Sequence, residues 1–244
     1  MRIIGLIGGM SWESTAVYYR RINEQVRQHF GGLHSAEVIM RSVDFADIVA
    51  LQQADKWDEA GTMLSRISRD LQNAGASCVV ICTNTMHKLA DRVQSAIDVP
   101  LIHIVDVTAQ ALRGAGMRRP LLLATRYTME QDFYLSRLRE RHGIAAIVPA
   151  QPDRAAIHDI IFGELCRGVV CDASRQRTID IIARGRSDGA DSVILGCTEI
   201  GLLIGPQHSA LPAFDSTLLH ADAAVDFVLG RAQSVERVAA DIAI

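Results

Sequence analysis

The chain lacks the features that mark several whole classes of protein. It contains no basic tract, and its 244 residues carry a formal net charge of −3 at pH 7. Binding to nucleic acid depends on a surplus of Lys and Arg, so we expect no nucleic-acid partner. No segment has the length and apolar character of a membrane span, and the opening residues Met1-Arg2-Ile3-Ile4-Gly5 lack the layout of a secretory signal. We therefore expect a cytoplasmic protein with no membrane partner.

Motifs for metals and nucleotides are also missing. The five cysteines include no CxxC pair, and no histidines stand at the spacing of a structural zinc site. An odd number of cysteines in a reducing compartment predicts free thiols. The turn Gly8-Gly9-Met10-Ser11 has neither the GxGxxG pattern nor the lysine of a P-loop. We expect neither a metal nor another cofactor.

What the chain does have is a regular alternation of strand and helix patterns. Apolar residues make up 49% of it and charged residues 22%, which allows a substantial core. The alternation predicts an α/β fold of mainly parallel sheets flanked by helices, with ligands bound beyond the carboxyl ends of the strands. The expected strands are 2–7, 37–43, 78–82, 100–105, 120–125, 144–149, 192–196 and 212–214, and the main expected helices are 14–30, 56–74, 130–142, 155–167, 173–187 and 217–229.

Two strand patterns occur twice. Gly75-Ala-Ser-Cys-Val-Val-Ile-Cys-Thr-Asn-Thr85 aligns without a gap on Gly189-Ala-Asp-Ser-Val-Ile-Leu-Gly-Cys-Thr-Glu199, and Arg2–Ser11 aligns on Arg119–Thr128. We infer a duplicated α/β unit. The predicted division is a first lobe of 1–105 plus about 211–230 and a second lobe of 106–210.

The alignment places Thr83 in register with Cys197, each after an apolar strand. Cys197 precedes a predicted helix start, and the positive end of a helix lowers the pKa of a thiol. At the first copy, Cys82 and Thr83 point to opposite faces of an extended strand, so only one of them can face a site. The register selects Thr83, although a hydroxyl is far less acidic than a thiol, whose usual pKa is about 8.5. Cys82 is the alternative.

Polar residues next to these strand ends could bind a carboxylate. Asn84, Thr85 and Thr198 combine hydroxyl or amide groups with backbone N–H groups at helix starts. Thr and Asn also cap helices, and the two roles are compatible. His87 could act as a general acid or base, or lie on a helix surface. Glu199 could orient a base, or favour the helix start electrostatically.

Three stretches together resemble a known family. Val79-Val-Ile-Cys-Thr-Asn-Thr-Met-His-Lys88 and Val193-Ile-Leu-Gly-Cys-Thr-Glu-Ile-Gly-Leu-Leu203 resemble the two signatures of the aspartate/glutamate racemases, and Gly8-Gly-Met-Ser-Trp-Glu-Ser-Thr15 resembles the amino-terminal motif of the aspartate racemase branch. The resemblance covers essentially the whole chain. It implies two pseudo-symmetric α/β lobes with the active site in the cleft between them, a homodimer, and a cofactor-independent reaction on a small acidic amino acid.

In that family one cysteine removes the α-proton and another returns a proton to the opposite face. This chain departs from the pattern, because Thr83 stands where one catalytic cysteine is expected and Cys197 is retained. The resemblance therefore implies Thr83 and Cys197 as catalytic residues of an aspartate and/or glutamate racemase with an apparent L-preference. Arg126 or Arg167 could neutralise the side-chain carboxylate. The implied substrate contacts are Met10, Gln52, Asn84, Thr85, Thr125, Thr128 and Thr198.

Two other functions fit the same residues. A decarboxylase of malonate-like acids needs one cysteine to protonate a carbanion, which suits Cys197. A non-catalytic amino-acid sensor would keep the fold and bind aspartate or glutamate without turnover. Aspartate and glutamate differ by one methylene, so the choice between them depends on the packing around the pocket.

Overall fold

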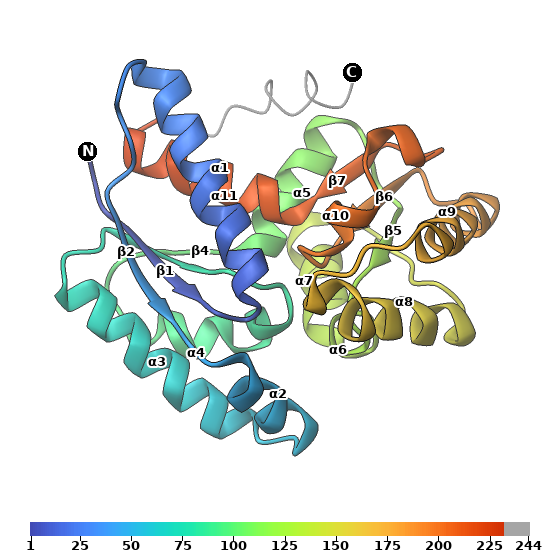
Figure 1. Cartoon of the computed structure of the whole chain (residues 1–244), viewed down its shortest axis with the longest axis horizontal. Helices are drawn as coiled ribbons and strands as arrows, with labels where there is room; N and C mark the ends of the chain where they lie inside the picture. The colour runs from blue at the N-terminus through green and yellow to red at the C-terminus, as the bar shows by residue number, and fades with distance from the viewer. Residues whose placement is uncertain (232–244) are drawn as a thin grey trace. The chain divides into compact units, whose positions relative to one another are not determined.

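The computed structural model describes residues 1–231, which divide into two compact units. The first unit comprises residues 1–103 and 220–231, and the second comprises residues 104–219. Each contains a parallel sheet with flanking helices, as Figure 1 shows, and this confirms the predicted α/β class.

The sheet of the first unit has the order β2-β1-β3-β4, and every pairing is parallel. Its central strands β1 and β3 are fully buried, which agrees with the absence of polar side chains from Ile4–Gly8 and Cys78–Ile81. In Figure 1, α3 covers one face of this sheet and α1 the other. The elements are β1 (Ile4–Gly8), α1 (Trp12–Phe30), β2 (Val38–Ser42), α2 (Phe45–Gln53), α3 (Trp57–Asn73), β3 (Cys78–Ile81), η1 (Thr85–Leu89), α4 (Ala90–Gln94) and β4 (Leu101–Ile102).

The sheet of the second unit has the order β5-β6-β7, again parallel. Its elements are α5 (Ile104–Gly114), β5 (Pro120–Leu123), α6 (Arg126–Glu130), α7 (Asp132–His142), α8 (Gln151–Gly163), η2 (Leu165–Arg167), α9 (Asp172–Ser187), β6 (Ser192–Leu195), α10 (Ile200–Leu203), η3 (Pro206–His208) and β7 (Ala213–Asp215). The last helix, α11 (Ser216–Leu229), begins in this unit and continues into the first.

The two sheets repeat one pattern. Ile4 pairs with Cys78 between β1 and β3, and Pro120 pairs with Ser192 between β5 and β6. An isolated parallel bridge joins Leu121 of β5 to Ile147. This bridge has the place beside β5 that β2 has beside β1. With Cys78 matched to Ser192, these registers match Ile4 to Pro120. The sequence alignment matched Ile3 to Pro120, so it was one residue out at this strand.

The structure corrects three predicted boundaries. Strand β7 pairs with β6, so residues 211–219 lie in the second unit and not in the first lobe. The expected strand at 144–149 is reduced to the bridge at Ile147. The expected strand at 100–105 ends at Ile102, because α5 begins at Ile104.

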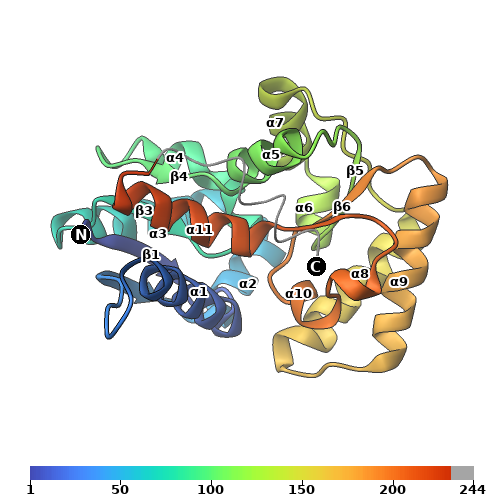
Figure 2. The same cartoon turned by 90° about the horizontal axis from the view of Figure 1, so that it is seen from above.

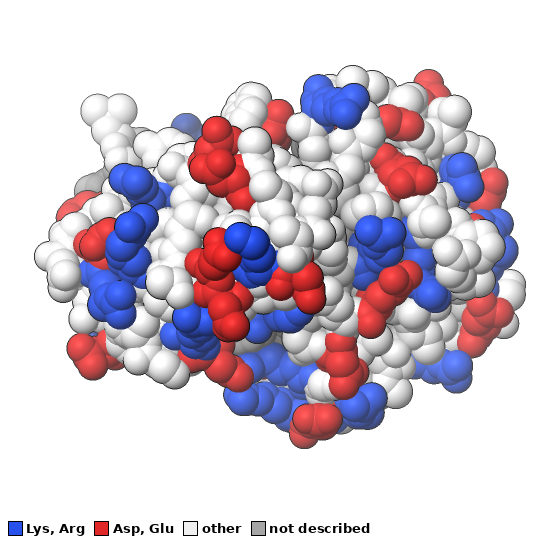
Figure 3. All heavy atoms as spheres, turned by 90° about the horizontal axis from the view of Figure 1, so that it is seen from below, with Lys and Arg blue, Asp and Glu red and all other residues white. Residues whose placement is uncertain are grey.

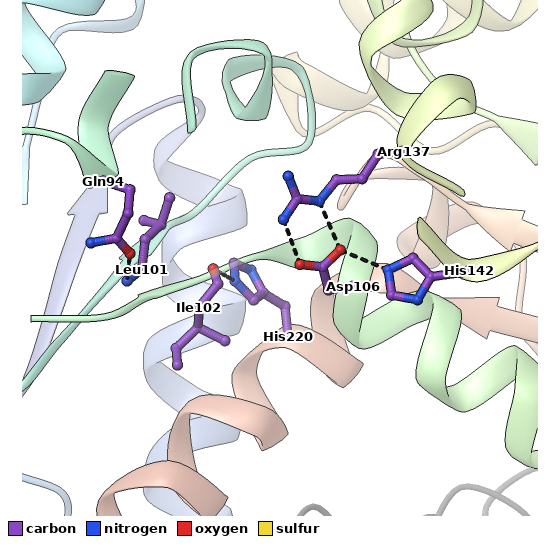
Figure 4. A network of polar contacts seen from close by, with 7 residues as sticks. All are labelled: Gln94, Leu101, Ile102, Asp106, Arg137, His142 and His220. Atoms are coloured by element: carbon purple, nitrogen blue, oxygen red, sulfur yellow. Dashed lines mark hydrogen bonds and ion pairs between the residues drawn. The ribbon is translucent and has the colours of Figure 1, made fainter. Parts of the chain in front are cut away.

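In each unit an Arg–Asp ion pair joins two helices. Arg21 of α1 donates from Nε and Nη2 to the Asp222 carboxylate of α11 at 2.7 and 2.6 Å, and the two helices lie side by side in Figures 1 and 2. Arg137 of α7 makes the same bidentate pair with Asp106 of α5, also at 2.7 and 2.6 Å (Figure 4). His142 Nε2 lies 2.8 Å from Asp106.

The remaining observations concern the hydrophobicity of the helices and the charge on the surface. None of the helices within residues 1–231 combines the length and apolar character needed to cross a membrane. On the face drawn in Figure 3, acidic and basic side chains are intermingled.

Candidate active-site residues

The first candidate group, called here the first tip, comprises residues 82–85 at the carboxyl end of β3. Cys82 is completely buried, and its N–H donates to Ile7 O at 3.0 Å. Burial raises the pKa of the Cys82 thiol far above its usual value. Thr83 is half-buried, and its N–H turns back to Ile81 O at 2.8 Å. Of these two neighbours, only Thr83 has a side chain that reaches solvent.

The turn after β1 lies beside the first tip. Gly9 has a φ of 86°, and a Cβ there would come within 2.2 Å of Val43 O, so the turn requires glycine. Ser14 at the start of α1 donates from Oγ to Cys82 O at 3.1 Å, which ties the turn to the tip. Met10 is buried in the apolar core of the first unit. Gln52 is also buried, and its Nε2 lies 3.2 Å from Met86 Sδ.

Three histidines lie in contact behind the first tip. His87 Nδ1 lies 2.7 Å from Thr83 O, and since a carbonyl only accepts, this nitrogen carries the proton. The His87 ring meets those of His103 and His220, with centroids 4.8 and 5.3 Å away. His220 Nε2 donates to Ile102 O (Figure 4), so its Nδ1 accepts from Tyr18 Oη, both at 2.7 Å. Burial, helped by the charge of His87, lowers the pKa of His220 to about 3.

Sequence reasoning identified His87 but not His103, His220 or Tyr18. These residues come from segments far apart in the chain, and no motif links them. Among residues 1–231, no group of three or more His, Cys, Asp or Glu side chains could hold a metal ion, and the three histidines are related by contacts between their rings.

The second candidate group, called the second tip, comprises residues 196–199 at the carboxyl end of β6. A Cβ at Gly196 would come within 2.7 Å of Leu122 Cδ1, so glycine lets β6 pack closely beside β5. Cys197 is 9% exposed and Glu199 is 4% exposed. The Cys197 thiol donates to Glu199 Oε2 at 3.0 Å. The second tip is therefore a nearly buried pair of a thiol and a carboxylate.

The electrostatics of Cys197 differ from the expectation drawn from the sequence. Burial, and after it the negative charge of Glu199, raise the pKa of the Cys197 thiol well above its usual value. The predicted lowering of this pKa by a helix start is wrong. Helix α10 has only four residues, so its dipole is small, and the adjacent carboxylate opposes it.

Other predicted residues of the second unit fall into two groups. Thr198 is buried in the second tip. Thr125 and Thr128, at the carboxyl end of β5, are buried with their hydroxyl oxygens 3.2 Å apart. Arg126 and Arg167 are both exposed, and the Arg126 N–H donates to His158 Nδ1 at 3.3 Å. In the first unit, Asn84 and Thr85 are buried at the start of η1.

Comparison with known proteins identifies relatives of the chain. Residues 7–224 match the family model described as Asp/Glu/hydantoin racemase. The chain is 20% identical over 238 residues to the broad specificity amino-acid racemase RacX of Bacillus subtilis, and the match covers 93% of this chain and 98% of RacX.

Solved structures give closer matches. A Yersinia pestis protein, whose crystal structure is named as that of a proposed Asp/Glu racemase, is 48% identical, with a TM-score of 0.88 over 94% of this chain and 100% of that one. An aspartate racemase homologue from Pyrococcus horikoshii is 32% identical, with a TM-score of 0.82 and the same coverage.

Proposed function

From the finding that the chain belongs to the Asp/Glu/hydantoin racemase family and is a PLP-independent amino acid racemase, we propose that it racemises aspartate and/or glutamate with an apparent preference for the L-enantiomer. The observation that carries the proposal is the pair of equivalent strand ends. Cys197 follows β6 and Thr83 follows β3 in matching register, while the rival Cys82 is enclosed in the core. The chain thus offers one thiol and one hydroxyl where two thiols would serve both enantiomers.

The proposed roles follow from the chemistry of inversion. Removal of the α-proton leaves a planar carbanion, and inversion requires a proton donor on the face opposite the base. Cys197 removes the α-proton of the L-enantiomer, and the Thr83 hydroxyl serves the other face. A hydroxyl is a far weaker acid than a thiol, so the Thr83 side is the slower one.

Microscopic reversibility limits what an L-preference can mean. Two enantiomers have equal free energies in water, so the ratio of kcat/KM in the two directions is near unity. The preference therefore consists of α-proton exchange without productive inversion. L-enantiomers lose their α-proton to Cys197 many times before a proton arrives on the opposite face.

Groups at the strand ends supply the proposed substrate contacts. The hydroxyls of Thr85, Thr125, Thr128 and Thr198, with the Asn84 amide and neighbouring backbone N–H groups, are suited to a carboxylate and to the negative charge of the carbanion. Met10 and Gln52 are proposed contacts through their position near the first tip. Arg126 and Arg167 are alternative partners for the side-chain carboxylate.

Deuterium exchange at the α-carbon tests this function. The full chain is incubated in D2O with L- and D-aspartate and L- and D-glutamate, and loss of the α-proton signal is followed by NMR. We expect rapid exchange of one or both L-substrates, slow exchange of the D-forms, and no exchange with Cys197→Ala. Exchange that survives in Cys197→Ala would rule out this thiol as the base. Binding in calorimetry without exchange would point to the sensor, and carbon dioxide release from an arylmalonate to the decarboxylase.

The proposal includes a cytoplasmic homodimer. Free thiols are maintained in a reducing compartment, and Trp12 and Tyr19 expose 68% and 51% of their surface on α1, which supplies apolar area for a second copy. Sedimentation of the full chain tests the dimer, and replacement of both residues by Ser should shift it to a monomer.

A further inference from the structure

The hydroxyl of Thr217 differs from other buried hydroxyls of the second unit. Thr217 is 1% exposed, and its Oγ1 has no hydrogen-bond partner within the part of the chain that the structure describes. Its neighbour Ser216 donates from Oγ to Leu195 O at 2.8 Å, and Thr178 donates from Oγ1 to Ser174 O at 2.8 Å. Burial of a hydroxyl without a partner costs free energy, so folding alone does not explain this one.

The repeat shows that packing does not require a hydroxyl at this position. The strand registers match Ile102 of β4 to Phe214 of β7, so Val105 takes the place of Thr217 in the other copy. Both side chains are buried, and valine has the same branched shape with a methyl group in place of the hydroxyl. The position therefore accepts an apolar side chain of this shape.

Thr217 lies next to the second tip in the order of the sheet. Leu195 at the end of β6 pairs with Asp215 at the end of β7. Cys197 follows β6 by two residues, and Thr217 follows β7 by two residues, so they share one register position. Adjacent strands lie about 4.8 Å apart, and ligands of parallel sheets bind beyond the carboxyl ends of the strands. The unpartnered hydroxyl thus belongs to the edge of the sheet that carries the thiol.

The charges at this edge favour a cation. Asp215 Oδ1 accepts from the N–H groups of Thr217 and Leu218 at 2.9 and 3.1 Å, and its charge offsets the positive end of α11. Glu199 supplies a second carboxylate, and residues 192–204 and 213–219 contain no Lys or Arg. An anionic group beside Thr217 would meet like charge, whereas an ammonium group would meet opposite charge.

We propose that Thr217 is a further substrate contact, whose hydroxyl oxygen accepts a hydrogen bond from the α-ammonium group of the amino acid. The ammonium nitrogen is bonded to the α-carbon, so holding it beside the second tip keeps the α-hydrogen within reach of Cys197. No covalent bond forms or breaks at Thr217. The inference rests on the proposed racemase function and assigns a group that distinguishes an amino acid from a simple dicarboxylate.

Urea unfolding tests whether the hydroxyl is paired inside the protein. Thr217→Val removes no hydrogen bond of the folded chain, so its unfolding midpoint should equal or exceed that of the wild type. Thr178→Val, the matched control, loses the bond to Ser174 O and should unfold at a lower urea concentration. A comparable fall in both variants would overturn the inference, because the Thr217 hydroxyl would then have a partner in the protein.

α-Proton exchange in D2O tests the contact during turnover. A hydrogen bond to a charged group contributes about tenfold or more, so Thr217→Val should lower kcat/KM for the L-substrate by at least that factor. Thr217→Ser, which keeps the hydroxyl, and Thr178→Val should stay within about threefold of the wild type. If the wild type exchanges neither L-aspartate nor L-glutamate, the proposed function fails. If it exchanges either one and Thr217→Val stays within about threefold, only the role of Thr217 fails.

Calorimetry with two ligands separates an ammonium contact from a carboxylate contact and needs no turnover. Succinate has the two carboxylates of aspartate but no amino group. Thr217→Val should weaken the binding of L-aspartate by about tenfold or more and leave the binding of succinate unchanged. If Thr217→Val does not fold, Thr217→Ala, which lacks the same hydroxyl, replaces it here and in the exchange. Equal weakening of both ligands, or unchanged binding of L-aspartate, would overturn the inference.

Discussion

The two tips occupy equivalent positions in their own sheets but differ in their capacity for proton transfer. The second tip joins a thiol to a carboxylate at 3.0 Å. The first tip presents the Thr83 hydroxyl, with His87 donating to the backbone carbonyl of the same residue at 2.7 Å. In the first tip, His87 binds the backbone of Thr83 and fixes its position. In the second tip, Glu199 binds the thiol of Cys197 itself. The comparison indicates that the difference between the Thr83 hydroxyl and the Cys197 thiol is one part of a wider difference between the units.

The helices behind the tips extend the comparison. Tyr18 and Tyr134 stand equally far after Ile4 and Pro120, which the strand registers match, and both are completely buried. Their partners also correspond, since His220 follows β7 as Thr108 follows β4. In the first unit the partner is an imidazole that accepts from Tyr18, and in the second it is a hydroxyl beside Tyr134. The repeat thus keeps the tyrosine but changes the group that faces it.

Replacing the Cys197 thiol of the second tip by a hydroxyl should have the largest effect. Cys197→Ser replaces the thiol by a group far less acidic, so exchange of the L-substrate should fall by about a thousandfold or more. NMR-detected exchange in D2O measures this, with Cys171→Ser as the control that should exchange normally. A Cys197→Ser variant with exchange within about tenfold of the wild type would mean that the thiol is not the base.

Converting the first tip toward the second should give the next largest effect. Thr83→Cys should raise D-enantiomer exchange by about 10²-fold, since a thiol is a far stronger acid than a hydroxyl. Thr83→Ser, which keeps the hydroxyl, should give no such gain. A Thr83→Cys variant shown to be folded by circular dichroism, with D-enantiomer exchange no faster than the wild type, would contradict the proposed role of this position.

Much of the fold could be predicted because buried parallel strands are short aliphatic runs between amphipathic helices. The errors arise where that signal is ambiguous. Ile104 and Val105 continue the apolar run of β4, and both are completely buried at the start of α5, so the periodicity of this helix is hidden. Residues 211–219 are connected in sequence to the final helix, and only strand pairing shows that they belong with β6.

For the candidate site, alternation along the strand indicated only that Cys82 and Thr83 do not face the same side, and the register of the repeat favoured Thr83. Cys82 is enclosed and Thr83 is half-buried, and the role of Thr83 in the site stays a prediction. The direction of the Cys197 pKa could not be predicted in the same way. It depends on the depth of burial and on the side chain of Glu199 turning back to the sulfur, and both are tertiary properties. His220 was missed because it reaches the cluster from a helix near the other end of the chain.

Removing the polar partners of the two buried tyrosines should have unequal effects on stability. His220→Leu takes a hydrogen bond of 2.7 Å from both Ile102 O and Tyr18, so the free energy of unfolding should fall by about 2 kcal/mol. Thr108→Val removes a hydroxyl that donates to Ile104 O at 2.8 Å, a helix carbonyl, and should cost about 1 kcal/mol or less. Urea unfolding of both variants measures the difference. Equal losses would mean that the imidazole contributes no more than the threonine.

A slope in the pH dependence of stability is the effect expected of His220 in the first unit. His220 is neutral in the folded protein because burial, and next the charge of His87, lower its pKa to about 3. In the unfolded chain a histidine binds a proton below about pH 6.5. Below that pH the unfolded state holds more protons than the folded state, so stability is complete above about pH 6.5 and falls by about 1.4 kcal/mol per pH unit toward pH 3.

His220→Gln isolates this contribution, because glutamine does not titrate and can still donate to Ile102 O. Tyr18, His87 and, behind His87, His103 are the titratable groups around His220, and they remain in the variant. Urea unfolding between about pH 7 and pH 5 should give a wild-type curve that falls more steeply than that of His220→Gln. Parallel curves would mean that His220 takes up a proton in the folded state, with its bond to Tyr18 reversed so that Nδ1–H donates to the hydroxyl. In that case protonation of His220 would not destabilise the folded protein. The Tyr18–His220 pair would then make the stability no more sensitive to acid than Tyr134 and Thr108 do.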